Sequence, residues 1–143
     1  MSDIVVDSSV VAKWILPEAD SADAQRLITT AEAAGEQLIV LDLAFPEVAN
    51  AIWKRQHRRL ITETEARVFL AELRRIPVRV EPAARLIASA FEIACRYDRS
   101  VYDALFVAMA RDLALTGVTA DEPLYNAVHV DMPQIVLLRN RSG

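Results

Sequence analysis

The amino-acid sequence predicts an α/β fold, in which helices flank an open parallel sheet of about five strands. Three observations predict it. Short apolar segments, most of them rich in β-branched residues, alternate along the chain with longer segments that have helical periodicity. No repeat, linker or low-complexity segment interrupts this alternation. The chain has 143 residues, of which 53% are hydrophobic and 25% charged, and these values are typical of one soluble globular domain. We therefore expect a single domain over residues 1–143.

The strands and helices follow from local signals. The predicted strands cover residues 4–6, 38–41, 77–81, 118–120 and 135–138, and the last is expected at an edge of the sheet. The predicted helices cover residues 8–16, 21–34, 43–59, 62–75, 82–97 and 100–111, and a short helical turn covers 122–126. Ser8 or Ser9 can cap the first helix, and Pro17 ends it. Gly35 suits the end of the second helix.

The later helices have start signals of their own. Residues 62–65 (TETE) form a capping-box pattern, and Ser100 with Asp103 resembles another. Pro82 is expected as the first residue of its helix. Residues 104–110 are apolar nearly all round a helix, which predicts a central helix. Cys95 lies in a helical apolar pattern and is expected in the core.

Composition and charge exclude several classes of protein. No apolar run approaches the roughly 18 residues that a membrane helix needs, so no membrane association is expected. The first strand is preceded by Asp3 and by no basic segment, unlike a secretion signal. One cysteine allows no internal disulfide, which favours a reducing, cytoplasmic location. The net charge of −4 argues against a general nucleic-acid binder.

Four acidic residues lie where a strand passes into a helix, or in the first turn of a helix. They are Asp7, Glu47, Asp103 and Asp121. In a parallel sheet, the carboxyl ends of the strands and the amino ends of the helices share one edge, so these acids can meet in one crevice. Carboxylates that lie close together repel, and a hard divalent cation is the usual way to hold them.

Each of these acids also has an ordinary explanation as a helix cap or as a partner of the helix dipole. That explanation is weaker for Asp7 and Asp103, because both adjoin segments that should be buried, and a buried carboxylate needs a partner. No Lys or Arg is adjacent to Asp7. The bases nearest to Asp103 are Arg96 and Arg99, which precede the helix cap and are expected to point away.

Four segments of the chain, in order, resemble the motifs of PIN-domain ribonucleases. They are residues 4–14 (IVVDSSVVAKW), 41–51 (LDLAFPEVANA), 102–110 (YDALFVAMA) and 119–122 (TADE). The four acids stand at the acidic positions of these motifs. The resemblance extends from Ile4 to about Leu138. The length, without appended domains, is similar to that of VapC, the toxin half of toxin–antitoxin pairs in bacteria and archaea.

This resemblance implies a fold, an activity and a set of partners. The fold would be a single PIN-like domain, and the activity would be that of an endoribonuclease dependent on Mg²⁺ or Mn²⁺, in which metal-activated water cleaves RNA phosphodiesters. Asp7 and Asp103 would be the principal metal ligands, Glu47 and Asp121 would complete the acidic site, and Ser9 would help to order ligands or water. The implied partners are an RNA substrate and a small antitoxin protein, and a homodimer is typical of the relatives.

Other readings stay open at this point. Receiver domains also gather acids and Mg²⁺ at strand ends, but they need a Lys near the last strands, and none follows Lys54. Phosphatases of the haloacid-dehalogenase type need a second Asp two residues after the first, where this chain has Ser9. A non-catalytic RNA- or protein-binding module of PIN-like fold is the third alternative.

The resemblance to a ribonuclease toxin also implies two binding surfaces. Basic residues at helix ends could contact phosphates that flank the cleaved bond, or could simply be solvated; they are Arg55, His57, Arg58, Arg59, Arg74 and Arg75. An antitoxin is expected to bind an apolar groove between helices, near Trp14 and the helix at 21–34.

Overall fold

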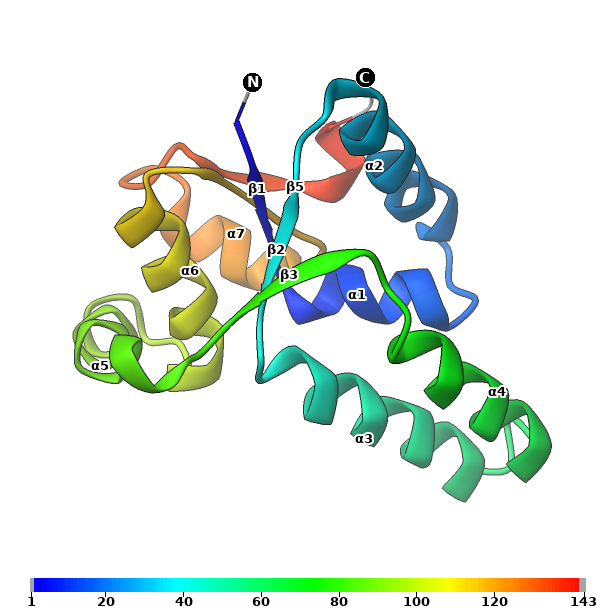
Figure 1. The fold of residues 1–143 in the computed structure, drawn as a ribbon. Helices are drawn as coiled ribbons and strands as arrows, with labels where there is room; N and C mark the ends of the chain where they lie inside the picture. Colours follow the sequence, from blue (N-terminus) through cyan, green and yellow to red (C-terminus); the bar gives the residue numbers. More distant parts are fainter. Residues whose placement is uncertain (1, 142–143) are drawn as a thin grey trace.

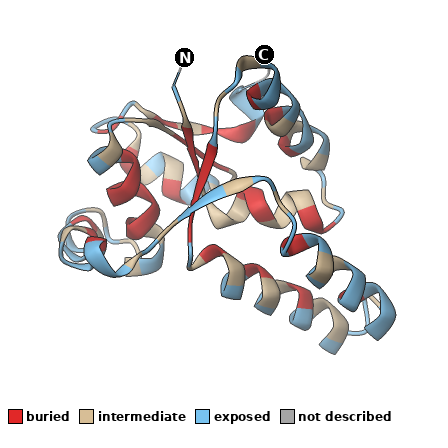
Figure 2. Ribbon diagram, in the orientation of Figure 1, coloured by how far each residue is buried: buried red, intermediate tan, exposed pale blue. Residues whose placement is uncertain are grey.

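The computed structural model describes residues 2–141 and contains one sheet of five parallel strands (Figure 1). The strands are β1 (Ile4–Val6), β2 (Leu38–Leu41), β3 (Val78–Glu81), β4 (Thr116–Thr119) and β5 (Ile135–Leu137). Their spatial order is β3-β2-β1-β4-β5. β1 is central in the sheet, and it is buried along its whole length, as the sequence predicts (Figure 2). The expected α/β fold is confirmed.

Seven helices in the described chain cover the two faces of the sheet. They are α1 (Ser8–Ile15), α2 (Ser21–Ala34), α3 (Ala44–His57), α4 (Glu63–Leu73), α5 (Ile87–Tyr97), α6 (Val101–Leu113) and α7 (Glu122–Val128). Alternate residues of each central strand point to opposite faces. Ile4 and Val6 therefore pack in a core with α1 to α4, while Val5 packs in a second core with α5, α6 and α7. Within residues 2–141, no helix is long and apolar enough to cross a membrane.

The strand order places a topological switch point beside β1. Chain connections run outward from β1 to β2 and β3 on one side, while β4 and β5 lie on the other side. In open α/β sheets, ligands bind in the crevice outside the carboxyl ends of the strands at such a point. Asp7 follows the last residue of β1, and Thr119 ends the neighbouring β4. These two positions therefore mark where a functional crevice is expected.

One glycine permits the close approach of α6 to the sheet. A Cβ atom on Gly117 of β4 would lie 2.9 Å from Cζ of Phe106 and 3.1 Å from Cβ of Ala110, both on α6. It would also lie 3.0 Å from Cδ1 of Ile135 on β5. The distance of 2.9 Å is shorter than a carbon–carbon contact allows, and the other two are tighter than ordinary van der Waals contacts. The missing side chain thus lets the most apolar helix pack directly on the strand that ends at the crevice.

Most predicted elements appear within two residues of their expected ends. The capping box of Thr62 and Glu65 is present, and Gly35 ends α2 in a left-handed conformation. The largest difference concerns Pro82: β3 ends at Glu81, a 3₁₀ turn follows at Ala84–Leu86, and α5 begins only at Ile87. Proline at a first helical position is permitted but does not dictate a start there, because its fixed φ also suits a loop.

The expectation that Cys95 lies in the core is wrong. Its side chain is exposed. Helix α5 covers α6 with one face only, and its buried residues include Ala90 and Ile93. Cys95 follows Ile93 by two residues, which turns it about 200° around the helix and away from that face. An apolar pattern alone did not distinguish the two sides of this helix.

Candidate active site

Asp7 lies at the centre of the candidate site and is fixed there by hydrogen bonds from both sides of the switch point. Its backbone N–H donates to the carbonyl oxygen of Val118 at 3.0 Å, which extends the pairing of β1 with β4. Its Oδ1 accepts from the Ser8 N–H at 2.9 Å, and its Oδ2 accepts from the hydroxyls of Ser9 and Thr119, both at 2.8 Å. Asp7 is therefore also the N-cap of α1, and the expectation that Ser8 or Ser9 caps this helix is wrong, because the helix already begins at Ser8.

Ser9 and Thr119 connect Asp7 to the fourth acidic motif. The Ser9 Oγ accepts from the N–H of Ala120 at 3.0 Å, and the Thr119 Oγ1 accepts from the N–H of Asp121 at 3.0 Å. Thr119 is fully shielded from solvent, and among residues 2–141 it is the one polar residue that is buried as a whole. Ser9 thus contacts both Asp7 and the loop that carries Asp121, while its role in ordering ligands or water stays a prediction.

The other three acids are held at helix starts. Glu47 lies in the first turn of α3. Asp103 lies in the first turn of α6, where its N–H donates to the Ser100 hydroxyl at 3.1 Å. Asp121 caps α7 by accepting from the N–H of Leu124 at 3.1 Å. Because helix amino ends carry partial positive charge, each of these positions favours a carboxylate.

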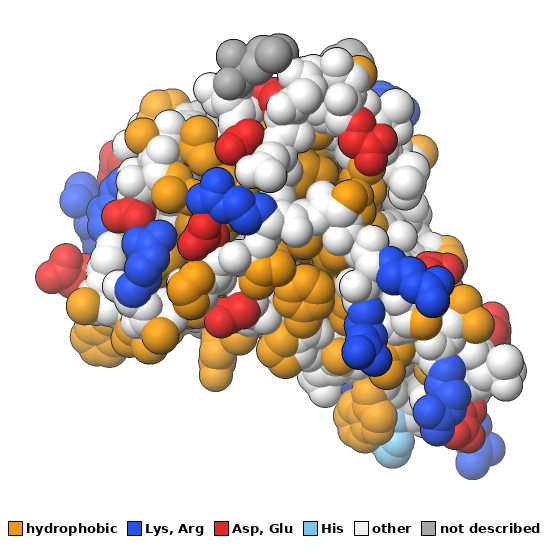
Figure 3. Space-filling view, viewed as in Figure 1, with side chains coloured by type: hydrophobic (Ala, Val, Ile, Leu, Met, Phe, Trp, Pro, Cys, Tyr) orange, Lys and Arg blue, Asp and Glu red, His pale blue; other side chains and the backbone are white. Residues whose placement is uncertain are grey.

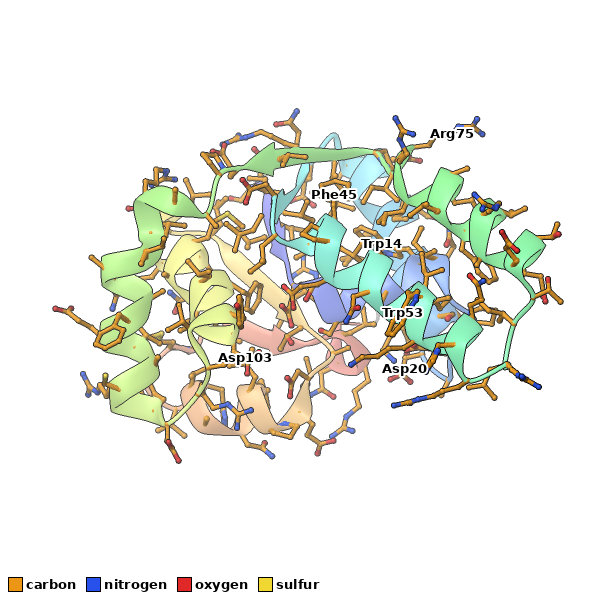
Figure 4. The ribbon with its side chains drawn as sticks, turned by 90° about the horizontal axis from the view of Figure 1, so that it is seen from below. Trp14, Asp20, Phe45, Trp53, Arg75 and Asp103 are labelled. Atoms are coloured by element: carbon orange, nitrogen blue, oxygen red, sulfur yellow. The ribbon has the colours of Figure 1, made fainter. Side chains whose placement is uncertain are left out.

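The four acids line one cleft of about 240 Å³. Its walls also include Ser8 and Ser9 of α1 and small residues of α1 and α3. The cleft opens at the carboxyl edge of the sheet, and Figure 4 views the molecule from below, with Asp103 labelled at the start of α6. Acids separated by more than a hundred residues in the sequence therefore share one crevice, as the strand order predicts.

Burial and mutual repulsion raise the pKa values of three of these carboxyls. Burial is the main cause at Asp7, where the hydroxyls of Thr119 and Ser9 oppose the rise and Asp103 adds to it. At Glu47, on the rim of the cleft, partial loss of water raises the pKa first, followed by the charges of Asp7 and Asp103. At Asp103, burial again leads, and Asp121 adds to the rise in pKa. Each of these carboxylates therefore disfavours the charged form of its neighbours.

One contact differs from the sequence-based expectation. Arg99 does not point away from the cleft: its Nη2 donates to Oδ2 of Asp103 at 3.4 Å, and this contact opposes the rise in the pKa of Asp103. Arg96 behaves as expected, since it faces Asp131 on the surface at 3.5 Å. Glu122, next to Asp121, pairs with Arg139 at 3.1 Å.

The oxygen atoms that line the cleft suit a hard divalent cation, although the side chains are not placed close enough together to coordinate one. Carboxylate and hydroxyl oxygens are what Mg²⁺ and Mn²⁺ prefer. In the described part of the chain, no three acidic, His or Cys side chains stand in an arrangement that holds a metal as they are placed. Carboxylates that lack a cation repel each other, and Asp103 is engaged by Arg99.

The raised pKa values predict an unusual dependence of stability on pH. The relevant pH window lies between the ordinary carboxyl pKa values, 3.8 for Asp and 4.5 for Glu, and the raised pKa values of the folded protein. Within this window, the folded metal-free protein binds more protons than the unfolded chain. The contribution of these groups to the free energy of unfolding therefore falls as pH rises through that window. Urea unfolding in EDTA at a series of pH values measures this effect. The fall should be smaller in Asp7→Asn, and equal slopes in the two proteins would argue against it.

The sequence did not identify Thr119 as a residue of the site, and it did not distinguish basic residues that are free to contact RNA from those that pair within the protein. The signal for Thr119 was its place as a polar residue at the carboxyl end of a buried strand, two residues before Asp121. Of the basic residues proposed for phosphates, Arg55 pairs instead with Glu18 at 2.9 Å, and His57 stacks on Trp53 with ring centroids 4.9 Å apart. Both are therefore already engaged in contacts within the protein.

Comparisons with known proteins identify the family. The family model of the PIN domain matches residues 4–129. Ribonuclease VapC3 of Pyrobaculum aerophilum is 37% identical over 123 residues, which cover 85% of this chain and 91% of that protein.

Two solved structures share the fold. The crystal structure of PAE2754 from Pyrobaculum aerophilum has a TM-score of 0.73 at 19% identity and covers 97% of this chain and 85% of that one. A toxin–antitoxin complex from Klebsiella pneumoniae has a TM-score of 0.63 at 16% identity and covers 95% and 98%. The receiver-domain and phosphatase readings are set aside by these matches. The family model spans most of this chain, and VapC3 is similar to it over 85% of its length. The chain therefore belongs to the PIN-domain family, among the VapC ribonucleases.

Proposed function

We propose that the chain is an endoribonuclease dependent on Mg²⁺ or Mn²⁺ and the toxin of a toxin–antitoxin pair. The observation that carries the proposal is the cleft of about 240 Å³ lined by Asp7, Glu47, Asp103 and Asp121 at the switch point of the sheet. The ribonuclease name of its relative VapC3 supports RNA as the substrate. A cleft with this much negative charge repels RNA phosphates unless a cation balances the carboxylates.

The residues have distinct roles in this proposal. Asp7 and Asp103 are the principal metal ligands, and Glu47 and Asp121 complete the set directly or through water. When bound, a divalent ion supplies Lewis acidity, which makes water easier to deprotonate and neutralises charge on the phosphate. The hydroxyls of Ser9 and Thr119 hold Oδ2 of Asp7, so that this carboxylate keeps its orientation while Oδ1 stays bonded to the start of α1.

An antitoxin requires a binding surface of its own. With the structure in view, we expect that surface at a different place from the one that the sequence suggested. Trp14 is engaged within the protein, since its Nε1 donates to the carbonyl of Ala24 at 2.7 Å. An apolar groove of about 250 Å³ lies between α3 and α4 instead, with Trp53 55% exposed and Leu70 42% exposed. Figure 3 shows hydrophobic side chains exposed on this part of the molecule among Lys and Arg. We place the antitoxin there; a homodimer remains a prediction.

Expression in a bacterial host tests the proposed function. The wild-type chain should arrest growth, and RNA from the arrested cells should carry new ends at discrete positions when mapped by primer extension. If a short reading frame lies directly upstream of its gene, co-expression with the product of that frame should restore growth. Normal growth with intact RNA, at an expression level confirmed by immunoblot, would contradict the proposal.

A further inference from the structure

Arg99 lies at a corner between two helices whose ends fix its backbone. Asp98 closes α5 in a left-handed conformation with φ of 53°, and the Arg99 N–H donates to the carbonyl of Ala94 at 3.2 Å. Directly after Arg99, the Ser100 hydroxyl caps α6. Both flanking signals are local, so Arg99 is held beside the start of α6 by the chain itself and not by the contacts of its side chain.

The guanidinium of Arg99 is enclosed but poorly satisfied. Its side chain is 28% exposed, and its Nε is buried without a hydrogen-bond partner in residues 2–141. Its Nη2 contacts Oδ2 of Asp103 at 3.4 Å, whereas charge-assisted N–H···O bonds are typically about 2.7–2.9 Å. Buried donors are almost always paired, so a group left in this state needs an explanation.

Charge supplies that explanation. Within residues 2–141, Arg99 is the one cation that contacts any of the four cleft acids. Asp7 is held by hydroxyls and a backbone N–H, and Asp121 by a backbone N–H. Because a guanidinium is positively charged, Arg99 offsets part of the repulsion between the carboxylates. Attraction to the acids thus compensates for the missing hydrogen bond.

A divalent cation at Asp103 would have to share that carboxylate with Arg99. Two cations at one carboxylate repel each other, and the repulsion is strong where water is partly excluded. We propose that Arg99 is a resident counter-cation of the cleft that competes with the divalent metal for Asp103 and thereby lowers the metal affinity. This inference rests on the proposed metal-dependent function. It makes Arg99 a positioning residue, whose charge rather than its packing sets the affinity of the cleft for the divalent metal.

Calorimetric titration of the metal-free protein with Mn²⁺ tests this inference. Arg99→Met removes the charge and keeps an unbranched side chain in place of the aliphatic part of the arginine. We expect it to bind Mn²⁺ about 3- to 30-fold more tightly than the wild type, because a nearby positive charge is gone. The rise in melting temperature on adding Mn²⁺ should also be larger in the variant. A purely structural role predicts the opposite sign, since a loosened Asp103 would bind metal more weakly. Equal or weaker binding overturns the inference.

Two matched variants separate charge from other effects. Arg99→Lys keeps the charge and should retain an affinity close to that of the wild type. Arg96→Met removes a base three residues earlier, whose side chain is 72% exposed and faces Asp131, and should leave the Mn²⁺ affinity unchanged. An equal gain in Arg96→Met would assign the effect to net charge and overturn the inference.

The outcomes also separate this inference from the proposed function. If Arg99→Met does not fold, Arg99→Gln carries the same expectation and the same criterion. A wild-type chain that binds no Mn²⁺ overturns the metal-dependent function, and the inference with it. A wild type that binds Mn²⁺, together with neutral Arg99 variants that bind it no more tightly, overturns the inference alone.

Discussion

Replacement of Asp103 by Asn is expected to lower the rate of RNA cleavage by at least about 100-fold, and replacement of Asp7 by Asn to do the same. The amide is nearly isosteric with the carboxylate but uncharged, so it is a much poorer ligand for a divalent cation. The fold should survive, because Asp103 is anchored by its backbone N–H to Ser100, and an amide at Asp7 can still bond to Ser8 and to both hydroxyls. Cleavage of a labelled single-stranded RNA in Mn²⁺ measures the effect.

The chain offers a matched control on the same helix. Asp112 also lies on α6, but it is exposed and pairs with Arg85 at 2.8 Å, away from the cleft. Asp112→Asn should therefore cleave RNA at the wild-type rate. Circular dichroism and melting temperature confirm folding of each variant. Wild-type rates in a folded Asp103→Asn protein would remove Asp103 from the proposed site.

Removal of divalent metal is expected to abolish cleavage as completely as these substitutions. With EDTA in excess, the four carboxylates repel the phosphate backbone, and no Lewis acid is present to activate water. Mg²⁺ or Mn²⁺ added beyond the chelator should restore the rate, and Mn²⁺ should also raise the melting temperature of the wild-type protein by relieving carboxylate repulsion. The assay compares initial rates in EDTA, in EDTA with excess Mg²⁺ and in EDTA with excess Mn²⁺.

The same assay separates an enzyme from a binding module of PIN-like fold. A non-catalytic module would bind RNA equally in EDTA and in Mg²⁺ and would leave it intact in both. A filter-binding measurement run beside the cleavage assay distinguishes these outcomes. Full cleavage in EDTA would contradict metal dependence, while the assignment to the PIN-domain family would stand.

The fold could be predicted because its determinants are local and periodic. Three β-branched residues predict that β1 is buried, and the apolar run 104–110 predicts a central helix. Both segments are buried in the structure. The position of the cleft followed from topology, since parallel strands bring their carboxyl ends to one edge. Asp7 and Asp103 could therefore be expected in one crevice before any distance was known.

The features that could not be predicted depend on the directions in which single side chains point. Arg99 turns toward Asp103 because a left-handed residue, Asp98, closes α5 just before it, and no local pattern specifies the direction that follows. Thr119 became part of the site only through the pairing of β4 with β1, a contact between residues 112 positions apart. Cys95 was misplaced because periodicity identifies a helix better than it identifies which of two apolar-looking faces is buried.

A crystal of the protein soaked in Mn²⁺ tests the central claim most directly, because the ion can be located by its anomalous scattering. The account predicts an anomalous peak in the cleft within about 2.0–2.6 Å of carboxylate oxygens of Asp7 and Asp103, with Glu47 and Asp121 bound directly or through water. Mn²⁺ found only elsewhere on the protein, with these carboxylates still apart at saturating metal, would contradict it.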